Sequence, residues 1–224
     1  MKPWAIVINL VLMCALGVAH AASKAYIANP YQCKSCHQAQ YDFWNKTHHS
    51  SAYLVLYAKQ QHLDPECVAC HSVGFGEKNG FTKTADALLL KGAPSRKSGE
   101  KPMIELVLET AFKGEKDPKE EKEILALDSR VQPDRYAKLK SAFHQKLDTV
   151  QEKPGWDKVY AGVQCENCHG NRADHVLKGP HKSKIKQPVK AALCIGCHDS
   201  MRDPGFSFAA KRALVACPKI GATP

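Results

Sequence analysis

The chain has 224 residues, with 32 Lys and Arg against 22 Asp and Glu, for a formal net charge of +10. Hydrophobic residues make up 44% of it but aromatic residues only 8%, a lean supply of core side chains for this length. The composition excludes collagen, coiled coils and multi-span membrane proteins, which need sequence repeats or long apolar runs. A basic balance by itself suggests a nucleic acid or an acidic protein as partner.

The first 21 residues have the three parts of a secretory signal peptide. Lys2 supplies a positive charge, residues 4–18 are apolar, and the Ala-His-Ala sequence at 19–21 fits a cleavage site. A membrane anchor is the alternative, but the apolar run is short for a span and Asn9 interrupts it. We therefore predict a signal peptide at 1–21 and a periplasmic protein without a stable membrane span after cleavage.

Eight of the ten cysteines fall in four copies of one pattern, Cys-x-x-Cys-His. This pattern is typical of c-type haem attachment, because two thioethers reach the two vinyl groups of the porphyrin and the adjacent histidine ligates iron. Zinc sites and disulfides also use paired cysteines, but neither needs a histidine directly after the second cysteine. The sequence therefore predicts four covalently attached haem c groups. The attachment residues are Cys33, Cys36, Cys67, Cys70, Cys165, Cys168, Cys194 and Cys197, and the iron ligands are His37, His71, His169 and His198.

Other histidines are candidates for the sixth position on each iron, since imidazole is a common second ligand where haem serves electron transfer. Outside the signal peptide and the four motifs there are six of them: His48, His49, His62, His144, His175 and His181. The remaining cysteine of the mature chain, Cys217, has no evident partner, and we expect an unpaired thiol.

Three segments together resemble the tetrahaem cytochrome c-554 family. Residues 33–56 read CKSCHQAQYDFWNKTHHSSAYLVL, residues 63–81 read LDPECVACHSVGFGEKNGF, and residues 163–176 read VQCENCHGNRADHV. The shared features are a Trp followed five residues later by His, a Cys-x-x-Cys-His-x-x-Gly-Phe segment, and Cys-Glu-x-Cys-His-Gly with a His six residues on. They occur in the family's order.

The resemblance implies specific distal ligands. His49 matches the histidine after Trp44 and would serve the fourth haem, with His48 the alternative by one register. His175 matches the histidine after the third motif and would serve the first haem. The second haem, on His71, would lack a protein ligand on its open face, although His62 is a candidate to close that site.

The sequence departs from the family at the third haem. The family takes that distal histidine from a C-terminal helical tail, which has no counterpart after Cys217. Instead this chain has a helical insertion at about 92–160, where a helix starting at Pro133 carries one apolar stripe, Tyr136, Leu139, Phe143 and Leu147. We predict His144, at the edge of the stripe, as the third-haem ligand. The alternative is a half-exposed helix histidine.

These features predict a mostly α fold, a multihaem cytochrome c with a haem-packed core, long loops and little β structure. A single tetrahaem domain is expected over 22–224, with helices over 38–57 and 103–112. A short hairpin near Gly74 is the one β feature expected.

The predicted function is electron transfer between redox partner proteins, and the Lys-rich stretch 178–190 could steer an acidic one. The alternative is an oxidoreductase acting on nitric oxide, nitrite or hydroxylamine at the second haem, and the pattern favours a carrier over an enzyme. Nucleic-acid binding is disfavoured, because no nucleic-acid-binding motif is present and roughly eight haem propionates offset most of the basic charge.

Overall fold

A computed structural model describes residues 26–88, 103–113, 132–151, 158–178 and 189–219. In this part of the chain the secondary structure is helical, and β pairing consists of isolated bridges, among them Ser72 with Ala161 and Phe75 with Phe81. The predicted mostly α class is therefore confirmed, and the hairpin expected near Gly74 is a turn closed by one bridge. The predicted signal peptide, His181 and most of the Lys-rich stretch lie outside the described residues.

The helices are short apart from one in the insertion. None of the helices in the described ranges is both long and apolar enough to cross a membrane. In chain order they are α1 (Pro30–Lys34), α2 (Gln38–Lys46), η1 (His49–Ser51), α3 (Ala52–Ala58), α4 (Pro65–His71), η2 (Thr84–Leu88), α5 (Met103–Ala111), α7 (Pro133–Gln151), α8 (Cys165–His169), α9 (Ala173–Lys178), α10 (Ala191–Cys194) and α11 (Phe208–Arg212).

The single helix predicted over 38–57 is wrong, because the chain breaks after α2. Thr47 has an extended backbone, and its hydroxyl donates to the Trp44 carbonyl at 2.7 Å. The Ser50 hydroxyl donates to the carbonyls of Asn45 and Thr47 at 3.0 and 2.9 Å. Serine and threonine hydroxyls compete with the helix for backbone carbonyls, so this cluster ends α2 and lets the chain turn before α3. The break places His49 at the start of η1.

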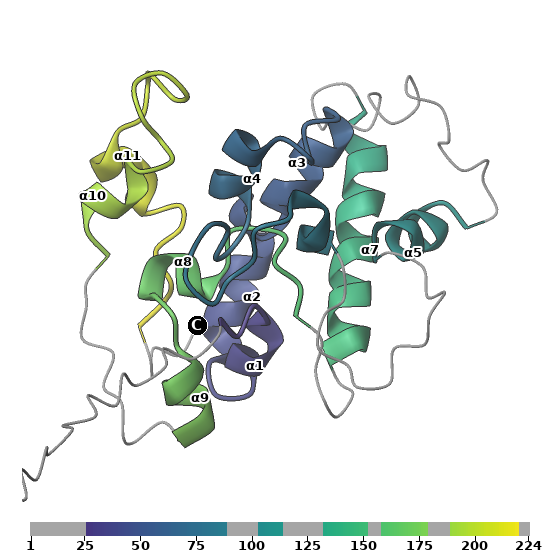
Figure 1. Ribbon diagram of the computed structural model, residues 1–224, viewed down its shortest axis with the longest axis horizontal. Helices are drawn as coiled ribbons and strands as arrows, with labels where there is room; N and C mark the ends of the chain where they lie inside the picture. Colours follow the sequence, from purple (N-terminus) through teal and green to yellow (C-terminus); the bar gives the residue numbers. More distant parts are fainter. Residues whose placement is uncertain (1–25, 89–102, 114–131, 152–157, 179–188, 220–224) are drawn as a thin grey trace, which may run out of the picture.

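The protein core lies where α3, α5 and α7 meet. Figure 1 shows α7 as a long helix with α5 beside it, and both helices lie where the apolar spacing predicts them. The predicted stripe of α7 is buried, with Leu139 and Phe143 fully inaccessible. Val107 and Phe112 from the α5 segment belong to the same cluster. The insertion therefore supplies a large share of the apolar core, which the sequence alone had assigned to porphyrin.

An extended segment, 159–163, runs through the centre of the structure and ties distant parts of the chain together. Each of its residues forms a backbone hydrogen bond to another segment. The N–H of Val159 donates to the Ala28 carbonyl at 2.9 Å, and the Tyr160 carbonyl accepts the N–H of Val73 at 2.9 Å. The next three residues donate their N–H groups to carbonyls: Ala161 to Ala87 at 3.0 Å, Gly162 to His71 at 3.0 Å, and Val163 to His49 at 2.9 Å. The loop before the third motif thus fixes both the second motif and His49.

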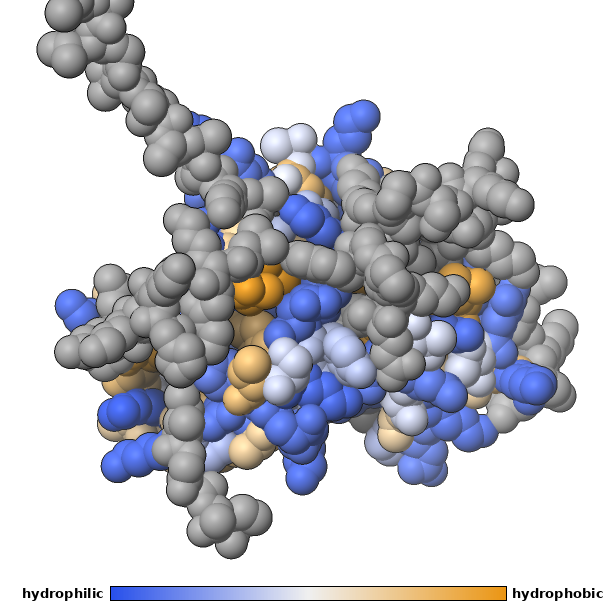
Figure 2. All heavy atoms as spheres, turned by 90° about the horizontal axis from the view of Figure 1, so that it is seen from below, coloured by the Kyte–Doolittle hydropathy of each residue, from blue (hydrophilic) through white to orange (hydrophobic). Residues whose placement is uncertain are grey.

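The C-terminal part, 189–219, contains no buried residue. It includes α10, α11 and the fourth motif, and Figure 1 shows these two helices at one side of the molecule. Figure 2 shows hydrophobic surface among hydrophilic side chains on that side. Large apolar side chains here are exposed, namely Leu193, Ile195, Met201, Leu214 and Val215. This part has no protein core of its own, so an apolar group packed on it would stabilise it.

We expect Gly162→Ala to destabilise the protein more than Gly76→Ala. Both glycines have positive φ, +90° and +72°, so an alanine at either costs about 1 kcal/mol of backbone strain. At Gly162 the added Cβ would lie 2.9 Å from the Ser50 carbonyl oxygen, whereas at Gly76 it meets open space. The overpacking should add roughly 1–3 kcal/mol. Urea unfolding followed by far-ultraviolet circular dichroism measures both losses, and equal losses would contradict the steric argument.

Candidate functional site

The four Cys-x-x-Cys-His motifs are far apart in sequence, but three pairs of them adjoin through their thiols. Cys33 of the first motif shares a hydrogen bond with Cys165 of the third. Cys70 of the second shares one with Cys197 of the fourth, and burial followed by this bond raises the pKa of Cys197 to about 12. Cys168 of the third motif interacts electrostatically with Cys194 of the fourth. The motifs therefore adjoin in the order first, third, fourth, second.

All nine cysteines in the described ranges are free thiols. Within those ranges no three side chains of the Cys, His, Asp and Glu types converge as a metal-ion site. Each pair of thiols is available for thioether formation.

Two of the candidate distal histidines lie opposite a motif histidine. The ring centroids of His37 and His175 are 6.2 Å apart, and those of His49 and His198 are also 6.2 Å apart. A metal–imidazole bond is about 2.0 Å long, so two imidazoles on opposite sides of one metal ion place their ring centres roughly 6.3 Å apart. The spacing of both pairs fits a shared haem iron.

Local structure positions both of these candidate ligands. The carbonyl of His49 accepts the N–H of Val163 at 2.9 Å, and the indole of Trp44 donates to the Val163 carbonyl at 2.8 Å. His49 is thereby held between the end of α2 and the loop that leads into the third motif. His175 lies on α9, which begins four residues after the third motif ends.

Two motif histidines have a hydrogen-bond partner at Nδ1, the ring nitrogen that would face away from a bound metal. His71 Nδ1 lies 2.8 Å from the carbonyl oxygen of Ala52, and His198 Nδ1 lies 2.9 Å from Oδ2 of Asp203. Both partners are acceptors, so Nδ1 carries the proton and Nε2 keeps its lone pair for iron. Asp203 was not among the predicted site residues, because no sequence pattern after the fourth motif marks it.

Burial keeps several of these imidazoles neutral, as metal ligation requires. Burial, with His198, His48 and His71 nearby, lowers the pKa of His49. Burial, with Arg172 and His37 nearby, lowers the pKa of His169. His62 has its pKa lowered by burial alone, and its ring lies 5.0 Å from that of Tyr57.

His144 lies on α7 and is buried. Burial, helped by the Lys140 ammonium, lowers its pKa to about 4, so the ring is neutral near pH 7. Its Nε2 is 3.4 Å from the Ser50 hydroxyl, and its ring contacts those of Trp44 and Phe143. Its Nδ1 is a buried nitrogen without a hydrogen-bond partner in the described residues. The structure therefore places His144 against Ser50, next to His49, and its ring contacts in the described residues are with Trp44 and Phe143 and not with His169.

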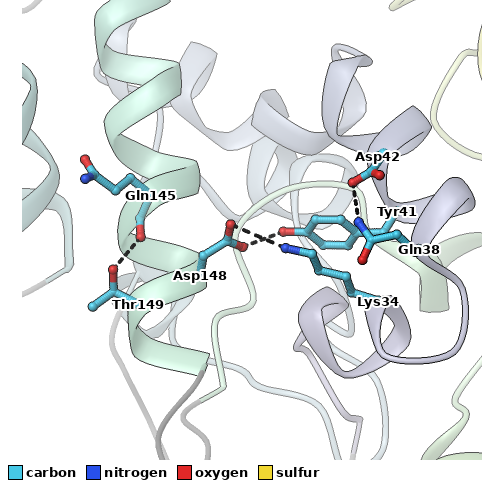
Figure 3. Close-up of polar contacts among 7 residues, drawn as sticks. All are labelled: Lys34, Gln38, Tyr41, Asp42, Gln145, Asp148 and Thr149. Carbon is cyan, nitrogen blue, oxygen red and sulfur yellow. Dashed lines mark hydrogen bonds and ion pairs between the residues drawn. The ribbon is translucent and has the colours of Figure 1, made fainter.

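The insertion helix α7 contacts the first motif. Figure 3 shows the Tyr41 hydroxyl donating to Asp148 at 2.7 Å, with the Lys34 ammonium 3.9 Å from the same carboxylate. Lys34 lies between the two cysteines of the first motif, and its ammonium also lies over the rings of Tyr31 and Tyr41. Burial and the Asp148 hydrogen bond raise the pKa of Tyr41. A polar contact thus links the insertion to the first haem attachment site.

Two side chains inside the third motif hold other segments in place. Glu166 is buried, and its carboxylate accepts backbone N–H groups from Ile27 at 3.2 Å, Ala28 at 2.9 Å and Arg172 at 3.0 Å. Asn167 donates to the Ser72 carbonyl at 2.9 Å, directly after the second motif. Glu166 is the Glu of the Cys-Glu-x-Cys-His pattern, but the sequence predicted no role for it. Its role is structural, because its buried carboxylate satisfies three backbone donors, two of them buried and one partly buried.

These features are those of a c-type cytochrome: paired free thiols, a histidine after each pair, and imidazoles at the spacing of two ligands on one metal. Residues 32–94 match the family model described as "Cytochrome c554 and c-prime". The chain is also similar to a Cytochrome c-554 from Nitrosomonas europaea, with 38% identity over 76 residues, which cover 27% of this chain and 32% of the relative. It thus spans about a third of that relative's length. No solved structure matches this chain.

Both matches support the cytochrome c-554 family, and they confirm the resemblance carried by the sequence motifs. This similarity implies covalently bound haem c. The matched region contains the first two motifs and His49, whereas the third and fourth motifs lie beyond it.

We expect Glu166→Gln to cost about 1–3 kcal/mol of the free energy of unfolding. The amide has only one acceptor oxygen, so its NH₂ group would face a backbone N–H that the carboxylate now satisfies. Glu105→Gln is the matched control, because Glu105 is exposed on α5. Urea unfolding curves of the two variants give the difference, and an equal effect of both would contradict the bonding role of Glu166.

Proposed function

We propose that this protein is a periplasmic tetrahaem cytochrome c that carries electrons between redox partner proteins. The observation that carries the proposal is the convergence of four Cys-x-x-Cys-His motifs, adjoining in the order first, third, fourth, second. When bound, haem c supplies reversible one-electron chemistry at iron. The chain's contribution is to hold four attachment sites next to one another and to present imidazoles to them.

The pairs of histidines support assignments of the distal ligands. His175 is proposed opposite His37 on the first haem, and His49 opposite His198 on the fourth, on the strength of the 6.2 Å centroid spacings. His144 is the proposed ligand of the third haem, supported by its burial, its neutral ring and its unpartnered Nδ1. Two imidazoles on one iron favour electron transfer over binding of an exogenous ligand.

The predicted signal peptide supports export to the periplasm, where c-type haem is attached and thiols do not stay reduced. The partners are proposed to be redox proteins. Because haem propionates offset most of the basic charge, the remaining positive charge is available to steer an acidic donor or acceptor.

Haem content is the first test of this function. The holoprotein, purified from a host with c-type haem maturation, should carry four haems by intact mass and by the pyridine haemochrome assay. A Cys194→Ala/Cys197→Ala variant should carry three haems, and it calibrates both measurements of the haem count. A chain that takes up no covalent haem would end the proposal.

The alternative function, a small-molecule oxidoreductase, requires the iron of the second motif to lack a ligand on one face. Carbon monoxide titration of the reduced protein decides between the two. Uniformly low-spin haems that bind no carbon monoxide support a carrier alone, whereas one high-spin haem in four that binds it would favour the alternative.

Replacement of each distal histidine by alanine should convert one low-spin haem to a high-spin form that binds carbon monoxide. We expect this for His49→Ala, His175→Ala and His144→Ala, because each removes one axial nitrogen. His48→Ala is the control, since His48 is exposed beside His49 and represents the other register. Electron paramagnetic resonance of the oxidised variants gives the spin states. An unchanged spectrum for any variant refutes that assignment, and a change in His48→Ala alone would shift the ligand by one residue.

A further inference from the structure

The motif histidines differ in what their outer ring nitrogen contacts. His71 Nδ1 meets a neutral backbone carbonyl, that of Ala52, at 2.8 Å, whereas His198 Nδ1 meets a carboxylate, that of Asp203, at 2.9 Å. The two hydrogen bonds are nearly equal in length, so the difference lies in the charge of the acceptor. A charged acceptor makes the stronger hydrogen bond and draws the Nδ1 proton further from the ring.

The loop after the fourth motif holds Asp203 in this position from both sides. The N–H of Asp203 donates to the Asp199 carbonyl at 2.8 Å, and the Asp203 carbonyl accepts the N–H of Phe206 at 2.9 Å. The ring of Phe206 stacks on the imidazole of His198, with centroids 4.7 Å apart and planes 15° apart. The turn therefore fixes both the carboxylate and the ring plane.

Two other charged groups lie in the same turn, but they satisfy each other. Arg202 forms an ion pair with Asp199, whose carboxylate also accepts the N–H groups of Met201 and Arg202. The guanidinium thus compensates the charge of Asp199. Asp203 is the acidic residue of this turn that contacts the imidazole directly.

We propose that Asp203 is a positioning residue that lowers the reduction potential of the haem held by the fourth motif. An imidazole that donates Nδ1–H to a carboxylate is the more basic ligand, and stronger donation through Nε2 stabilises ferric over ferrous iron. The inference rests on the proposed function, because it takes His198 as an iron ligand.

The consequence concerns where electrons reside along the row of motifs. The fourth motif adjoins the third through Cys194 and the second through Cys197. A lowered potential at this interior position makes the fourth haem hold an electron less well, and the electron is then retained on the neighbouring haems.

The test compares Asp203→Asn with Asp199→Asn in the tetrahaem holoprotein. Each variant removes one negative charge from the same turn, and asparagine at 199 retains the oxygen that accepts the Met201 and Arg202 N–H groups. Potentiometric titration followed by absorbance gives four midpoint potentials, and electron paramagnetic resonance identifies the haem ligated by His49 and His198 through the His49→Ala variant. We expect Asp203→Asn to raise the midpoint potential of the fourth haem by about 59 mV. At a fixed solution potential this is a tenfold higher ratio of reduced to oxidised haem.

In Asp199→Asn that potential should move much less, and Asp203→Glu should restore a value near the native one because it keeps a carboxylate. Unchanged potentials in Asp203→Asn, or an equal shift in Asp199→Asn, would overturn the proposal. If Asp203→Asn fails to retain four haems, Asp203→Ser is titrated in its place. Loss of the fourth haem from both neutral variants would assign Asp203 a structural role and also overturn the proposal. Absence of haem from the native chain would instead refute the proposed function.

Discussion

The arrangement of the site depends on one extended segment, residues 159–163. Its backbone hydrogen bonds reach Ala28 before the first motif, His71 and Val73 at the end of the second motif, Ala87 in η2, and His49. Because the third motif follows directly, these bonds hold the first three Cys-x-x-Cys-His motifs and the proposed ligand His49 in fixed positions relative to one another. Gly162 is needed in this segment, since its positive φ and the nearby Ser50 carbonyl leave no room for a side chain. Gln164 reinforces the bend by donating to the carbonyls of Val159 and Ala161.

The molecule combines one part with a hydrophobic core and one part without buried residues. On one side α3, α5 and α7 form an ordinary hydrophobic core with fully buried residues such as Leu54 and Phe143. On the other, 189–219 buries none of its residues and leaves large apolar side chains exposed. Apolar burial is the main favourable contribution to folding, so the second part depends on whatever its cysteines attach. Covalent haem would provide both the packing surface and the attachment that this part lacks.

The insertion has a clearer part in the fold than in the chemistry. It was predicted to bring a distal ligand to the third haem, and this stays a prediction. The structure shows that it supplies core residues. Asp148 links it to Tyr41 and, more distantly, to Lys34 in the first motif. His144 is within 3.4 Å of Ser50, next to the proposed ligand His49. A helix that contacts both the first motif and the His49 segment can influence two sites at once.

Local patterns were sufficient for some of these conclusions. The four motifs were visible because thioether and iron chemistry demands short, invariant spacing, and α5 and α7 because an apolar stripe repeats with the helical period. The break after Lys46 was missed, because hydroxyls at Thr47 and Ser50 capture carbonyls only once the chain has turned. Glu166 was noticed but had no role, because its three N–H donors come from residues on either side of the third motif.

The amino-acid sequence therefore predicted the cofactor chemistry, the helical class and the candidate ligands, all of which depend on residues close together in the chain. Only the tertiary structure decided which motifs adjoin, which histidines face each other, and which acceptor each motif histidine meets at Nδ1. His198 and Asp203 are five residues apart, yet their contact depends on how the intervening turn folds. His49 and His198 are separated by most of the chain. Contacts of this kind follow from how separate segments fold and pack, and no local pattern encodes them.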